Sequence, residues 1–195
     1  MRDSRKVSDY DVRSYRAGIR ELYERAMASG AVAETILAFH GGGASGGQEA
    51  LKLAGTVLDA LETSDAPACS RLGVYFMWRW AQALGVRPDL SACASCNREL
   101  SQDEALWYID RKEAFFCENC AARLASQMEN HTENPASSFR LGPGAISWLK
   151  AIESLPASGI KRVSLDGPSL EQARTLVQVI LALSLGQKLP TWDNI

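Results

Sequence analysis

The stretch Cys93-Ala-Ser-Cys96 … Cys117-Glu-Asn-Cys120 holds four of the five cysteines of this chain, as two Cys-x-x-Cys pairs separated by 20 residues. In a tetrathiolate zinc site, each short turn directs two thiolates at one ion, and the two turns together complete a tetrahedron. Four protein ligands leave no open coordination position for a water molecule. The spacing therefore predicts one structural Zn²⁺ held by Cys93, Cys96, Cys117 and Cys120.

Other interpretations of the cysteines stay open. The two pairs are also compatible with disulfides or with buried thiols, and a single Cys-x-x-Cys pair is typical of redox proteins, although such a pair normally occurs once and opens a helix after a strand. A zinc hydrolase or deaminase would need an open metal position beside a His-x-Glu motif, and neither His40 nor His131 has that spacing. Cys69 has no partner in view and is interpreted as a small thiol without a role.

The residues between the two pairs predict a small β-hairpin. Trp107, Ile109 and Phe115 alternate with polar neighbours on either side of Asp110-Arg111-Lys112-Glu113, the expected turn. A hairpin of this size is too small to be stable alone, so we expect zinc binding to supply its folding free energy. Residues 87–123 carry seven acidic and five basic side chains, a balance that disfavours phosphate binding.

Composition limits the classes of protein that fit. The 195 residues are 46% hydrophobic, which is enough for one compact core with a metal-binding insertion. Lysine and arginine total 21 against 23 acids, for a net charge of −2, and this balance does not predict nucleic-acid binding. The amino terminus lacks a secretory signal, and the chain has no apolar run that would span a bilayer. We therefore expect a cytoplasmic protein, a location that also favours zinc over disulfides.

The rest of the chain has helical periodicity, so we expect a mainly α fold: a helical bundle domain with an inserted four-cysteine zinc ribbon. The segment from Ser70 to Leu84 is apolar nearly all round, which is typical of a central, buried helix. The glycine run 41–47 lacks a phosphate-loop ending and is expected to connect two helices, the second of them capped by Ser45 with Gln48. The other expected helices span residues 14–39, 46–62, 121–128, 143–152 and 169–186.

These patterns divide the chain into three parts. Residues 1–13 are expected to be a polar leader or the remnant of an upstream domain, residues 14–91 and 124–192 the helical domain, and residues 92–123 the zinc-binding insertion. One stretch of the second helical part has a positive excess, with a single acid, Glu153, among four basic residues: Arg140, Lys150, Lys161 and Arg162. These four side chains are the candidates for contact with an acidic partner or with DNA.

Several of these features together resemble one known family. An apolar helix with Phe76, Arg79 and Leu84-Gly85 leads through Pro88-Asp89-Leu90 into the two cysteine pairs, and further helices follow. This arrangement, over residues 14–192, resembles the carboxy-terminal part of the bacterial recombination and repair protein RecO. The resemblance implies a recombination mediator without enzymatic activity, which binds single- and double-stranded DNA, anneals strands and, with RecR, helps to load RecA.

The resemblance also implies partners. In the family, the helical domain receives the acidic, aromatic-tipped tail of single-strand-binding protein in an apolar pocket beside basic residues. We expect the stretch from Arg140 to Arg162 to supply these basic residues here. RecO proteins begin with an oligonucleotide-binding barrel, and no succession of short strands precedes Ser14. We therefore expect the barrel to be absent and DNA binding to be weakened. The alternative function is a nucleic-acid-binding or transcription-type zinc-ribbon adaptor, which predicts a basic hairpin.

Overall fold

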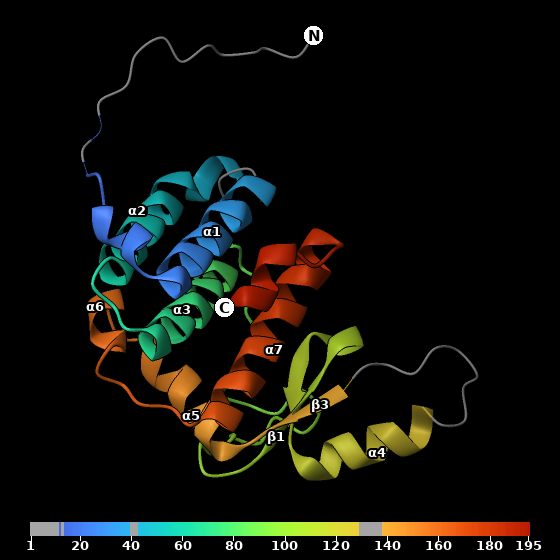
Figure 1. Ribbon diagram of the computed structural model, residues 1–195. Coiled ribbons are helices and arrows are strands. Elements are labelled where there is room, and N and C mark those ends of the chain that lie inside the picture. Colours follow the sequence, from blue (N-terminus) through green and yellow to red (C-terminus); the bar gives the residue numbers. More distant parts are fainter. Residues whose placement is uncertain (1–11, 13, 40–42, 129–137) are drawn as a thin grey trace, which may run out of the picture.

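Helix α3 (Ala66–Ala83) is the centre of the helical body. Its side chains are buried without interruption from Leu72 to Trp78, and Trp80 is fully buried as well. It contacts α1 (Tyr23–Ala38), α2 (Gly43–Leu61) and α7 (Gly167–Leu185), and Figure 1 shows it in the middle of these helices. A helix that is apolar on nearly all sides has to be surrounded by other elements. The prediction of a central helix after Ser70 is therefore confirmed.

The computed structural model describes residues 12, 14–39, 43–128 and 138–195. The other elements of these ranges are η1 (Ala17–Glu21), β1 (Leu106–Ile109), η3 (Asp110–Lys112), β2 (Ala114–Phe116), α4 (Glu118–Met128), β3 (Ser138–Leu141), α5 (Pro143–Ile152), α6 (Ala157–Ile160) and η4 (Pro190–Asn194). The fold is mainly helical, as expected, with a small sheet at one end (Figure 1). Among the described helices, none combines the length and the apolar character needed to cross a membrane.

Two aspartates decide where the central and the last long helix begin. The Asp65 carboxylate accepts a hydrogen bond from the N–H of Ala68 at 2.9 Å, so α3 begins before the expected Ser70. Asp166 does the same for the N–H of Ser169 at 2.9 Å, so α7 begins at Gly167. The helix was expected to begin at Ser169, which instead lies within its first turn. A proline in the first turn of each helix, where a missing N–H costs nothing, favours these earlier starts.

The amino-terminal helix is interrupted, whereas the sequence predicted one continuous helix over residues 14–39. The short 3₁₀ helix η1 ends at Glu21, and the extended backbone of Leu22 (φ −136°, ψ 132°) separates it from α1. The Arg25 guanidinium fixes this break, because it donates to the carbonyl oxygens of Gly18 at 2.9 Å and Ser64 at 2.7 Å. Helix α2, in contrast, begins earlier than predicted. It starts at Gly43, inside the glycine run that was expected to connect two helices. Residues 40–42 and His131 lie outside the described residues.

The sheet has three antiparallel strands in the order β2-β1-β3. The predicted hairpin is confirmed, with Tyr108 opposite Phe115 in β1 and β2. The third strand, β3, was not predicted, because four residues are too few to show a strand period. Phe139 in β3 lies opposite Tyr108, with ring centroids 5.4 Å apart, and so extends the apolar face of the hairpin. Three strands with an apolar face are more stable than an isolated hairpin.

The sheet and the helices share one hydrophobic core. Buried side chains of the sheet, such as Leu106 and Leu141, belong to the same cluster as Leu72 and Trp78 of the central helix. A polar contact also joins the helical body to the segment between the cysteine pairs, because the Lys150 ammonium on α5 donates to the carbonyl oxygen of Leu100 at 2.8 Å. The cysteine-bearing segment thus shares its core with the helical body.

Candidate metal centre

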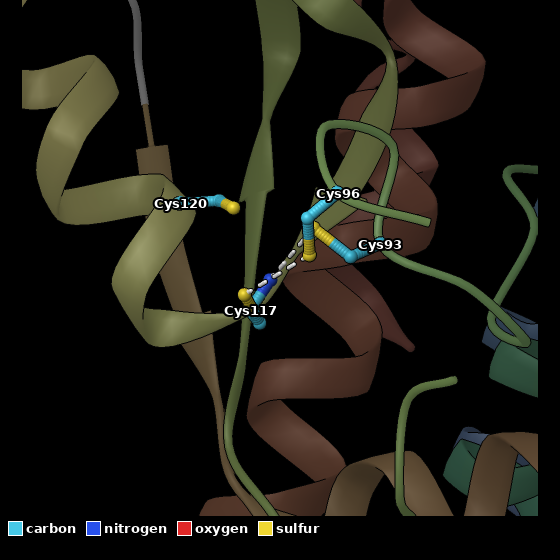
Figure 2. A group of neighbouring side chains, drawn as sticks. All are labelled: Cys93, Cys96, Cys117 and Cys120. Carbon is cyan, nitrogen blue, oxygen red and sulfur yellow. Dashed lines mark hydrogen bonds between the residues drawn. The ribbon is translucent and has the colours of Figure 1, made fainter. Parts of the chain in front are cut away.

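Four cysteine sulfurs meet at the edge of the sheet (Figure 2). The Sγ atoms of Cys93, Cys96, Cys117 and Cys120 all lie within 4.8 Å of one another, and those of Cys96 and Cys117 are 3.9 Å apart. A tetrahedral zinc with Zn–S bonds of about 2.3 Å places its sulfurs about 3.8 Å apart. All five cysteines are free thiols, and the four that meet have the number and spacing of a zinc ligand set. The predicted convergence of the two pairs is confirmed.

A tight turn presents the first pair. The N–H of Cys93 donates to the carbonyl oxygen of Arg98 at 2.8 Å, and the N–H of Asn97 donates back to the carbonyl oxygen of Cys93 at 2.9 Å. Asn97 has a φ of 57°, in the left-handed region that asparagine tolerates better than most residues. This reversal places Cys93 and Cys96 on the same side of the turn, facing the second pair (Figure 2).

The second pair spans the junction between β2 and α4. Cys117 follows the strand directly, and Cys120 lies in the first turn of the helix. The N–H groups of Cys120 and Ala121 both donate to the carbonyl oxygen of Cys117, at 3.1 and 3.0 Å. The two pairs are also joined by hydrogen bonds: the N–H of Cys117 donates to the Sγ of Cys93 at 3.4 Å, and the N–H of Ala94 donates to the carbonyl oxygen of Phe115 at 3.0 Å. These bonds align the two halves of the ligand set.

Hydrogen-bond donors favour the thiolate form at two of the sulfurs. Burial alone would raise the pKa of Cys93, but the backbone N–H groups of Cys117, Cys96 and Ser95 outweigh it and lower the pKa to about 6. At Cys120, the Arg123 guanidinium donates to the Sγ at 2.9 Å and lowers the pKa of that thiol. Thiolates are the form of cysteine that binds metal ions.

Cys96 shows why four such thiolates need a cation. The N–H of Arg98 lowers the pKa of Cys96, but the neighbouring sulfurs of Cys93, Cys120 and Cys117 outweigh it and raise the pKa to about 11. Like charges this close cannot all ionise unless a positive charge lies among them. Cys96 is also the exposed member of the set, whereas the other three are buried. The donor set fits a soft divalent cation such as zinc, with one edge open to solvent.

The four basic candidates do not form one cluster. Arg140 lies on β3, with its Nε 4.0 Å from the carboxylate of Glu118, and Lys150 on α5 is bound to the Leu100 carbonyl oxygen. Lys161 follows α6 and donates to the hydroxyl of Thr63, while its neighbour Arg162 is exposed. Figure 1 shows β3 and α6 on opposite sides of α5. A positive excess along the sequence does not ensure a positive patch, because the chain changes direction between these residues.

Sequence reasoning missed one outer contact of the cysteine cluster. The Arg123 guanidinium donates to the Sγ of Cys120 at 2.9 Å. The signal for Arg123 was available, since it follows Cys120 by three residues and so lies on the same face of α4.

One of three comparisons with known proteins finds a match. The family model described as Recombination protein O C terminal matches residues 20–193, a range that runs from η1 through the four cysteines to η4. Searches of curated proteins and of solved structures return no match. The resemblance stated from the central helix and the two cysteine pairs is confirmed by the family match. This chain therefore belongs to the family of the carboxy-terminal part of recombination protein O.

Proposed function

We propose that this chain acts as a mediator in DNA recombination and repair, working in the cytoplasm by docking other proteins and catalysing no reaction of its own. The observation that carries this proposal is the family match over residues 20–193. RecO proteins are recombination mediators, and the helical body with its metal-binding segment has the element order that the resemblance implies. The partners implied are a RecR-like protein and the tail of single-strand-binding protein, with DNA as a further ligand.

We further propose that the cysteine cluster holds one structural Zn²⁺ through Cys93, Cys96, Cys117 and Cys120. The ion would cross-link the first turn to the junction of β2 and α4. The residues themselves contribute the alignment, through the backbone bonds around Cys93 and Cys117, and they exclude water from three of the four sulfurs. With all four positions filled by protein, the site supports folding and no hydrolytic chemistry.

For the acidic tail of single-strand-binding protein, Lys161 and Arg162 are the best-placed candidates. They follow α6, whose Gly159 lies close to the partly buried Leu155, so that two basic residues come directly after an apolar contact. Arg140 and Lys150 are weaker candidates, because Glu118 and the Leu100 carbonyl oxygen already satisfy part of their charge. Opposite charges at the rim of an interface steer and orient a partner.

A peptide titration tests this docking. A labelled acidic peptide with an aromatic carboxy terminus is titrated against the wild type and the double variant Lys161→Ala/Arg162→Ala, with fluorescence anisotropy as the readout. We expect the double variant to bind about tenfold more weakly. Lys52→Ala serves as the control, since Lys52 is an exposed cation on α2 and its removal should leave the affinity unchanged. Equal binding by all three proteins, or no binding by any of them, rejects the docking site.

The charges of the ribbon argue against the alternative, a ribbon that reads nucleic acid. The Arg98 guanidinium lies 2.7 Å from the Glu104 carboxylate, and Arg123 is directed at a cysteine sulfur. Arg140 approaches Glu118, whose carboxylate also accepts from the Trp107 indole at 3.0 Å. Cations that are paired within the protein contribute little to phosphate binding. Mobility shifts over a salt series measure DNA binding directly, and strong binding that is lost with Lys112→Ala would favour the alternative.

A further inference from the structure

An arginine outside the ligand set points at one of the cysteine sulfurs. The Nη2 of Arg123 lies 2.9 Å from the Sγ of Cys120. Sulfur of a neutral thiol is a weak acceptor, whereas a thiolate accepts strongly from a charged donor. This contact therefore has its full value only when the Cys120 sulfur is a metal-bound thiolate.

Arg123 approaches the cluster from the helix side. It lies three residues after Cys120 on α4, so the two side chains project from the same helix face.

The charge of a loaded site gives this arginine a role. One Zn²⁺ with four thiolates carries a net charge of about −2, and this charge lies beside a hydrophobic core. Three of the four sulfurs are buried, so water compensates little of it. The Arg123 guanidinium, in contact with sulfur, supplies opposite charge at Cys120.

We propose that Arg123 is a positioning residue of the zinc site, which compensates the charge of the tetrathiolate and retains the ion. The inference rests on the proposed zinc site and extends it to a residue that does not touch the metal. A hydrogen-bonded thiolate is a poorer nucleophile, so the same contact slows the attack of Cys120 on electrophiles. Outer contacts of this kind are typically worth about 10–100-fold in metal affinity.

The experiment measures zinc affinity and zinc release in the full chain. A chromophoric chelator competes for zinc with the wild type, Arg123→Ala and Arg123→Lys, and a second assay follows zinc release after addition of an alkylating reagent. We expect about 10–100-fold weaker binding and faster release for Arg123→Ala. Arg123→Lys, which keeps the charge and loses the planar fork, should fall in between. Lys112→Ala is the control, because Lys112 is a cation of the same ribbon and no described contact joins it to sulfur.

Two results overturn the inference, and they differ in what else they reject. Wild-type affinity and release rate in Arg123→Ala reject the role of the arginine and leave the zinc site standing. A wild-type protein with no measurable zinc affinity rejects the proposed site together with the inference. Circular dichroism of each zinc-loaded variant separates loss of affinity from loss of folding. If Arg123→Ala does not fold, Arg123→Lys still decides the outcome.

Discussion

The side chain of Ile195 occupies the space above Gly73 on the central helix. A Cβ atom added at residue 73 would overlap the Cγ2 of Ile195 and lie 3.0 Å from its Cβ. Rotation of the Ile195 side chain moves its Cγ2 but not its Cβ, so the approach to the Cβ remains. The buried residues Trp192 and Ile195 pack the last segment against the body in this way.

Gly73→Ala is expected to destabilise the protein by about 1–3 kcal/mol, as overpacked core substitutions do. Chemical denaturation with circular dichroism measures the change. The matched control is Gly30→Ala on α1, where an added Cβ meets nothing within 4 Å. That control should stabilise the protein by up to about 1 kcal/mol, because alanine is the better helix former. Equal effects of the two substitutions would contradict the contact with Ile195.

Thr35→Val is expected to cost about 1–3 kcal/mol, because it leaves a buried donor without its acceptor. The indole Nε1 of Trp192 donates to the hydroxyl of Thr35 at 2.8 Å, and both side chains are fully buried. Valine has nearly the shape of threonine, so packing is retained while the acceptor is lost. Thr35→Ser keeps the acceptor and should cost less in the same denaturation experiment. A larger loss for serine than for valine would show that the methyl group matters more than the hydroxyl.

Asp65→Ala is expected to destabilise the protein by about 1 kcal/mol, the usual value of an N-cap. The carboxylate of Asp65 accepts from the N–H of Ala68 at the start of the central helix. Asp65→Asn retains a capping oxygen and should stay close to the wild type in thermal denaturation. The capping role is contradicted if the asparagine and alanine variants lose the same stability.

Cys69 is expected to be inert in the folded protein. It is buried in the central helix, and burial raises its pKa to about 11, so the neutral thiol dominates throughout the range from pH 6 to pH 9. A colourimetric thiol reagent should therefore detect no rapidly reacting Cys69 in the native, metal-loaded protein. Denaturation should release it, and Cys69→Ser should remove that signal. Rapid reaction of one thiol that is absent from Cys69→Ser would contradict the burial.

The sequence predicted the features that depend on local spacing. The two Cys-x-x-Cys pairs, the apolar helix after Ser70 and the alternation around Trp107 and Phe115 each specify an element by themselves. These elements are confirmed, and together they carry the family resemblance.

The features that the sequence did not predict depend on contacts between distant segments. Strand β3 is recognised only by its pairing with β1, since four residues carry too little periodicity, and the break at Leu22 depends on the bonds that Arg25 makes to Gly18 and Ser64. A count of charges along the chain misses pairing for the same reason, because sequence order does not reveal the partners of Arg140 and Lys150, the Glu118 carboxylate and the Leu100 carbonyl oxygen.

The metal content of the purified chain tests the central claim most directly. Protein prepared under reducing conditions without added metal is analysed for zinc by mass spectrometry, beside Cys93→Ser/Cys120→Ser and Cys69→Ser. The account predicts one zinc per chain in the wild type and in Cys69→Ser, and a large loss in the double variant, which lacks one sulfur of each pair. Folded, reduced wild-type protein that contains no zinc and takes up none when it is added would contradict the account.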